Sequence, residues 1–180
     1  MPMSSRVVPE IRVAAVPGDP SRGLLIAGSL VAPCALGRSG IRLDKREGDG
    51  ATPAGAFGLV EIRYRPDRVR RPRTTLPASA IRPDSGWCDD PASRFYNRPV
   101  HLPFPANHER LWRDDALYDL LVVLDHNLAF PRRGRGSAIF LHLASPDLAP
   151  TAGCVAVSLT AMRRLLAVAG PSTRLVVGRL

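Results

Sequence analysis

Short apolar runs separated by glycine and proline constrain the fold of this chain most strongly. The 180 residues include 15 glycines and 18 prolines. Runs of this length, bounded by turn-forming residues, are typical of strands and too short for most helices. We therefore predict a mainly β fold. The predicted strands cover residues 11–16, 23–31, 57–64, 120–125, 138–144 and 174–178.

Length and composition predict a single domain. Hydrophobic residues make up 45% of the chain, which suits one core, and we place one domain over residues 1–180 with its motifs within about 23–178. No apolar run reaches the about 18 residues that a spanning helix needs. The first ten residues have no charged lead into an apolar block, so no secretory signal is visible.

One helix is predicted near the end of the chain. Ser158 can cap its start, and Gly170-Pro171 would stop it. Because Cys154 precedes this start by four residues, we expect the helix to favour a thiolate there modestly. The apolar residues at helical spacing are Leu159, Met162, Leu165, Leu166 and Ala169.

Residues 65–110 are rich in proline, arginine and aspartate and have little periodicity. This composition predicts long loops that run over the sheet. Loops of such length in a compact domain are often functional.

A histidine and a cysteine twelve residues apart are the strongest candidates for chemistry. Strand alternation places His142 on one face with Phe140, while Leu141 points to the other face. Cys154 directly follows Gly153, which allows a sharp turn. An imidazole that reaches a thiol can take its proton, and the thiolate can then attack a carbonyl. The alternative is that both residues only pack in a core, since free cysteines are usually buried.

Two separated motifs resemble one enzyme family. The box Thr151-Ala-Gly-Cys-Val155, with a histidine upstream, resembles the signature of the YkuD-type L,D-transpeptidase domain. The stretch Gly48-Asp-Gly-Ala-Thr-Pro-Ala-Gly-Ala-Phe57 resembles one found early in such domains, and we interpret it as a turn bordering the active site. Together with matching segments between them, the resemblance covers residues 26–166. It implies a β-sandwich with a helix following the catalytic cysteine.

The resemblance also implies roles for individual residues. Cys154 would be the nucleophile. His142 would be the general base and later the general acid, and a backbone carbonyl would hold its imidazole in place. The Cys154 amide would donate a hydrogen bond to the oxyanion of the tetrahedral intermediate, and Gly153 would allow the backbone conformation that this requires. The Thr151 hydroxyl would stabilise the loop. No cofactor is needed for this chemistry. Weaker candidates for substrate binding are Asp90, Tyr96, Asn97 and Tyr118.

The implied reaction is cysteine-dependent transpeptidation of peptidoglycan peptide stems through a thioester. Many members of the family carry bulkier polar residues where this chain has Ala152 and Ala156. A hydrolase on the same site, as L,D-carboxypeptidase, endopeptidase or amidase, is therefore the main alternative. The family implies the cell envelope or periplasm as location. Since no secretory signal is visible, an upstream start, atypical export or action in the cytoplasm stay open.

The formal net charge is +9, almost entirely from arginine, and Lys45 is the only lysine. A basic protein can bind nucleic acid, anionic lipid or acidic polymer, so a non-catalytic basic protein that binds wall or nucleic acid is a further alternative. The arginines are scattered and no nucleic-acid motif accompanies them, so we expect no nucleic acid partner. Cys34 and Cys88 could form a disulfide, although nothing demands one. The spacing of histidines and cysteines predicts no metal site.

Overall fold

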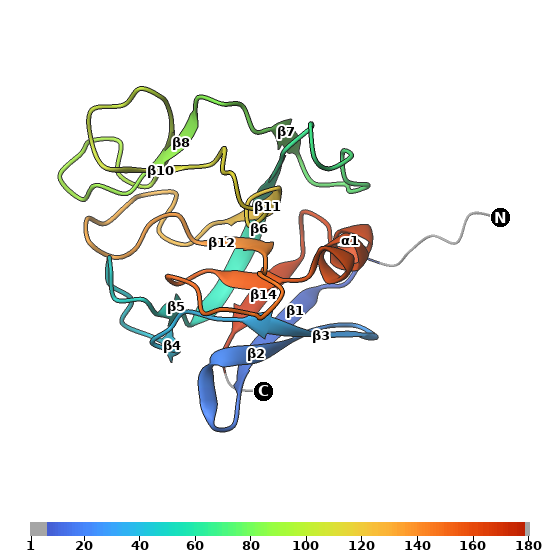
Figure 1. The fold of residues 1–180 in the computed structure, drawn as a ribbon. Coiled ribbons are helices and arrows are strands. Elements are labelled where there is room, and N and C mark those ends of the chain that lie inside the picture. The colour runs from blue at the N-terminus through green and yellow to red at the C-terminus, as the bar shows by residue number, and fades with distance from the viewer. Residues whose placement is uncertain (1–6, 179–180) are drawn as a thin grey trace.

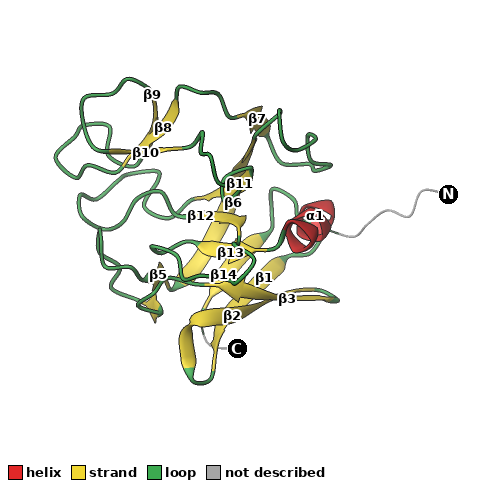
Figure 2. Cartoon of the chain, viewed as in Figure 1, coloured by secondary structure: helices red, strands yellow, loops and turns green. Residues whose placement is uncertain are grey.

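A computed structural model describes residues 7–178 and confirms a mainly β fold (Figure 1). Within this part of the chain there are fourteen strands and one helix (Figure 2). The strands are β1 (Glu10–Val16), β2 (Asp19–Ala27), β3 (Leu30–Ala35), β4 (Ile41–Arg42), β5 (Thr52–Pro53), β6 (Gly55–Tyr64), β7 (Ala78–Ala80), β8 (Ser85–Cys88), β9 (Arg98–His101), β10 (His108–Arg110), β11 (Leu120–Leu124), β12 (Phe140–Leu143), β13 (Val155–Val157) and β14 (Arg174–Val177).

The main sheet closes on itself. Its strand order is β11-β12-β13-β3-β2-β1-β14-β6-β7, and β11 also pairs with β6. Eight strands therefore form a ring of hydrogen-bonded neighbours, with β7 added outside at β6. A closed sheet has no free edges within the ring, which removes the usual route to strand-mediated aggregation. The predicted sandwich did not include this closure.

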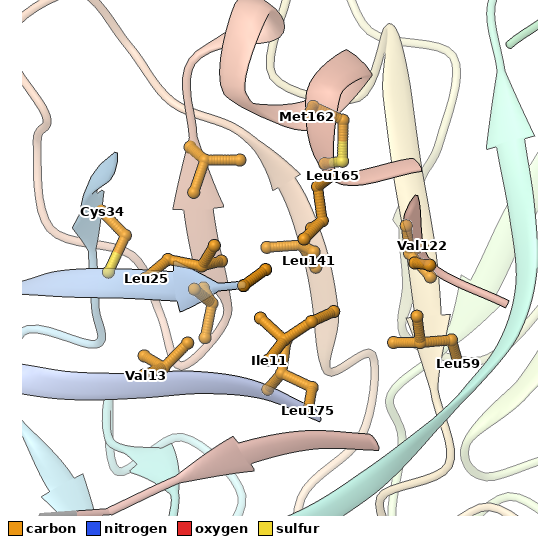
Figure 3. Packing of buried hydrophobic residues seen from close by; sticks show 14 of the residues in the cluster. Ile11, Val13, Leu25, Cys34, Leu59, Val122, Leu141, Met162, Leu165 and Leu175 are labelled. Atoms are coloured by element: carbon orange, nitrogen blue, oxygen red, sulfur yellow. The ribbon is translucent and has the colours of Figure 1, made fainter. Parts of the chain in front are cut away.

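The apolar core is formed by side chains from the ring and from the helix. Ile11, Leu25 and Leu141 are each 0% exposed, and Figure 3 shows them gathered with side chains from several strands. Burial of each large aliphatic side chain stabilises the fold by about 1.5–3 kcal/mol relative to exposure. This core fixes β12, the strand that carries His142.

The helix α1 (Leu159–Val168) begins and ends close to its predicted bounds. The Ser158 side chain accepts a hydrogen bond from the Ala161 amide, as an N-cap does. Met162 and Leu165 on its buried face belong to the same core cluster as the ring (Figure 3). The prediction of a helix following Cys154 is therefore confirmed.

The prediction of long loops over residues 65–110 was partly wrong. Three strands in this segment form a second sheet of order β10-β8-β9, and β7 joins the main sheet. These strands have only three or four residues and include Pro99, so they lack the length and alternation that indicate a strand in sequence. The predicted strand at 23–31 is likewise two strands, since Gly28 turns the chain at φ 58°.

A second apolar cluster joins the small sheet to the outer face of the ring. Trp87 of β8 stacks edge-on against Phe140 of β12, with ring centroids 5.2 Å apart. The cluster also includes Tyr118 and Cys154. The small sheet thus packs against the side of β12 on which the catalytic candidates lie.

The three cysteines are free, so Cys34 and Cys88 form no disulfide. No helix within residues 7–178 is long and apolar enough to cross a membrane.

Candidate active site

A cavity of about 820 Å³ lies between β12, the loop before β13, the segment after β4 and the small sheet. Both His142 and Cys154 line it. The two candidates that are twelve residues apart in sequence therefore face one common space.

Strand register explains why the two side chains meet. Strands β12 and β13 are parallel neighbours, and His142 lies opposite Ala156. Cys154 lies two residues before Ala156, so all three point to the same side of the sheet, and all three line the cavity. On the other side of β12, Leu141 and Leu143 enter the ring core. The predicted alternation is confirmed.

Cys154 is 7% exposed, and its thiol has two polar contacts. Its Sγ accepts a hydrogen bond from the Phe140 amide at 3.3 Å and donates one to the Ala138 carbonyl at 3.2 Å. The amide stabilises a thiolate, whereas the carbonyl stabilises the protonated thiol. The sulfur is thus held in one position on the cavity wall.

The backbone around the thiol needs glycine. Gly153 has φ 142°, a conformation that other residues rarely adopt, and a Cβ there would lie 2.8 Å from the Ala51 carbonyl oxygen. The Thr151 hydroxyl accepts from the Gly153 amide at 3.1 Å and donates to the Cys154 carbonyl at 2.7 Å. The box is therefore a tight turn closed by its own threonine.

The upstream stretch 48–57 packs under this turn. The Thr52 hydroxyl donates to the Cys154 carbonyl at 3.4 Å, and Asp49 accepts from the Lys45 ammonium at 2.5 Å. Lys45 and Gly48 line the cavity. The stretch borders the site as expected.

His142 is buried and neutral at physiological pH. Burial lowers its pKa to about 4, although a hydrogen bond to the Leu143 carbonyl partly opposes this shift. Nδ1 lies 2.8 Å from that carbonyl oxygen, which can only accept, so Nδ1 carries the proton and Nε2 has the free lone pair. Tyr118 packs edge-on against the imidazole at 5.2 Å and lines the cavity.

The groups around Cys154 favour the neutral thiol overall. Burial, and to a smaller extent the Glu109 carboxylate, raise the pKa of the thiol to about 12. The Phe140 amide and the Lys45 ammonium lower it by less. The cavity is therefore lined by a neutral thiol and a neutral imidazole, not by an ion pair.

The other weak candidates lie beside the cavity but do not line it. The buried Asn97 accepts from Trp87 Nε1 at 2.9 Å and from the Ala138 amide at 3.1 Å, and its amide group donates to two carbonyls. It has no hydrogen-bonding group left for a ligand and instead positions the backbone that contacts the thiol. Tyr96 donates to Glu47 at 2.5 Å, and Asp90 caps a turn by accepting from the Ala92 amide.

Sequence analysis missed three carboxylates that line the cavity: Glu47, Asp89 and Glu109. Asp89 is adjacent in sequence to Asp90, the residue that sequence analysis named as a candidate for substrate binding. Glu109 lies on β10 and has no local motif, because the packing of the small sheet against β12 brings it to the site, and Glu47 comes from the segment between β4 and β5.

A thiol and an imidazole on one cavity wall are groups that cysteine-dependent acyl-transfer enzymes use. The YkuD L,D-transpeptidase catalytic domain model matches residues 24–177, so the chain belongs to this family. The family acts on peptidoglycan, which implies a location in the cell envelope. No curated protein and no solved structure shows significant similarity to the chain.

Proposed function

We propose that this protein is an L,D-transpeptidase that uses Cys154 as nucleophile and His142 as general base on peptidoglycan stem peptides. One observation carries the proposal: Nδ1 of His142 donates to the Leu143 carbonyl, which makes Nε2 the proton acceptor of a side chain that lines the same cavity as the Cys154 thiol. A buried histidine fixed in this tautomer is suited to accept a proton.

The donor substrate is a tetrapeptide stem whose third residue is a diamino acid and whose fourth is D-alanine. In the first half-reaction, Nε2 of His142 takes the thiol proton as Sγ of Cys154 attacks the carbonyl carbon attached to the L-centre of this diamino acid. The Phe140 amide, at 3.3 Å from Sγ, stabilises the developing thiolate. The imidazolium then gives the proton to the leaving amine of the terminal D-alanine. A thioester and free D-alanine result.

The tetrahedral oxyanion needs donors from the turn. We assign this role to the Cys154 amide, whose direction Gly153 sets through its unusual φ. Thr151 supports the turn through its two hydrogen bonds.

In the second half-reaction, an amine from another stem attacks the thioester carbon. His142 takes one proton from this amine and returns it to the departing thiolate of Cys154. The products are a new amide bond and the free thiol, so no net oxidant or cofactor enters.

A hydrolase is the second candidate because Ala152 and Ala156 both line the cavity. Their small side chains leave room near the thiol, and water entering that room would resolve the thioester to an acid. The two activities share the acyl-enzyme and differ only in its second reactant.

Purified protein and Cys154→Ser, incubated with tetrapeptide and cross-linked muropeptides, test the proposal by mass spectrometry of the products. Cross-linked dimers or exchanged D-amino acids formed only by wild type would support a transpeptidase. Shortened stems without new bonds would support the hydrolase. Unchanged substrates with both proteins would contradict either activity and favour a binding role.

A further inference from the structure

Two carboxyl groups in the cavity have no cation within ion-pair distance among residues 7–178. Glu109 of β10 is partly buried and accepts one hydrogen bond, from the Tyr118 hydroxyl at 2.5 Å. Asp89, which follows β8, has a buried Oδ1 atom with no hydrogen-bond partner. Neither forms an ion pair within residues 7–178, and burial raises the pKa of both carboxyl groups, so a bound cation would stabilise their ionised form. For a chain of net charge +9 such unpaired carboxylates are unexpected.

The nearby cations are engaged elsewhere. The Lys45 ammonium binds Asp49 at 2.5 Å and the Arg46 carbonyl at 2.7 Å. The Arg113 guanidinium binds both oxygens of Asp115, at 2.8 and 2.6 Å, and its charge partly offsets the raised pKa of Glu109 from a longer distance. The cavity therefore has cationic groups that are already paired and carboxylates that are not.

The remaining charged and titratable groups of the cavity do not change this balance. The Glu47 carboxylate accepts from Tyr96 and Ser137, and His108 Nδ1 lies 2.8 Å from a backbone carbonyl. Arg110 lines the cavity but is exposed, so solvent screens it.

Glu109 lies one side chain away from the reacting groups. The Tyr118 ring that donates to it packs edge-on against His142, and the Glu109 charge contributes to the raised pKa of the Cys154 thiol. A cation bound at Glu109 would consequently lie within the same small space as the thioester. The amine that resolves the thioester must enter that space.

We propose that Glu109 and Asp89 select the acceptor by binding the ammonium form of its amine. This inference rests on the proposed function and names the group that the site recognises in its second substrate. The bound ammonium loses one proton to solvent and attacks the thioester as the free amine. His142 passes the second proton to the Cys154 thiolate, so the charges and protons balance.

The test measures how the acyl-enzyme divides between cross-linking and hydrolysis. The donor is a tetrapeptide stem, and the acceptor is a tripeptide stem with a free diamino-acid amine at increasing concentrations. The variants are Glu109→Gln, which can still accept from Tyr118, and Asp89→Asn. The matched control is Asp90→Asn, because Asp90 lies in a turn outside the cavity lining.

We expect the acceptor concentration that gives equal cross-linking and hydrolysis to rise about tenfold or more in Glu109→Gln and Asp89→Asn, as loss of a charge-assisted contact predicts. Asp90→Asn should match wild type. Thioester formation in Glu109→Gln should be at least as fast as in wild type, since the thiol then ionises more easily. A merely structural role would slow both steps together and would overturn the inference.

If Glu109→Gln and Asp89→Asn divide the acyl-enzyme between cross-linking and hydrolysis as wild type does, the two carboxylates do not bind the acceptor. This result would not affect the proposed transpeptidase function. If wild type forms no thioester at all, the proposed function itself is wrong, and the acceptor assignment falls with it. The intact mass of the protein after donor addition distinguishes these two failures.

Discussion

The surroundings of Cys34 and Cys154 differ, although both thiols are buried and free. Burial raises the pKa of each to about 12. Cys34 on β3 belongs to the apolar core of the ring, and no other cause shifts its pKa. Cys154 instead contacts a backbone amide and a carbonyl and shares a cavity with His142. Burial alone therefore does not identify a nucleophile. The features that distinguish Cys154 from Cys34 are its position on a cavity wall and a histidine in the same cavity that can accept its proton.

Replacing each thiol should separate the two regions most strongly. Cys154→Ser should lower the rate of acyl transfer at least about a thousandfold, since no other described thiol lines the cavity. Cys34→Ala should retain the activity and lower the free energy of unfolding by about 1 kcal/mol through lost packing. Product formation and urea unfolding measure the two effects. Loss of acyl transfer in a folded Cys34→Ala protein would contradict the distinction.

The imidazole beside Cys154 should matter nearly as much as the sulfur. His142→Ala should slow thioester formation about 10²- to 10⁴-fold, because the thiol then lacks its proton acceptor. Release of D-alanine by the double variant with Cys154→Ala should be no slower than by Cys154→Ala alone if the two residues act as a unit. His101→Ala, at an exposed histidine, is the control. Near-normal thioester formation in His142→Ala would remove this residue from the mechanism.

The turn before Cys154 can be compared with an open turn elsewhere. Gly153→Ala should lower the free energy of unfolding by about 1–3 kcal/mol from backbone strain, and more from the clash with the Ala51 carbonyl. Gly134 also has a positive φ, 75°, but a Cβ there would have no atom within 4 Å. Gly134→Ala should therefore cost only the backbone strain. Denaturant unfolding of both variants measures the difference. Equal losses would mean that the turn is not tightly packed.

The smallest expected effect is on the pH dependence of stability. Because the pKa of His142 is about 4 in the folded protein and 6.5 for an unperturbed histidine, the unfolded chain binds more protons between these values. The contribution of His142 to stability is therefore complete above about pH 6.5 and is lost as the pH falls towards 4. His142→Gln should show a weaker decline over this range in urea unfolding. An identical decline in wild type and variant would contradict a buried neutral imidazole.

The local parts of the fold and the site could be predicted from sequence, and the parts made by long-range packing could not. Alternation around His142 and the cap at Ser158 follow from neighbouring residues, so they were predicted correctly. The closing pair β11–β6 and the small sheet depend on contacts between distant segments. For the same reason Glu109 was missed, and the raised pKa of Cys154 could not be anticipated, since both follow from tertiary burial.

The account depends most directly on whether an acyl group attaches to Cys154. Purified protein mixed with a tetrapeptide stem and quenched in acid can be analysed by intact mass and by mapping of the modified peptide. We predict an added mass equal to the stem without its terminal D-alanine, located on Cys154 and absent from His142→Ala on the same time scale. An adduct located on Cys34 or Cys88, or an unmodified protein that nevertheless releases D-alanine from the stem at a normal rate, would contradict a thioester at this cavity.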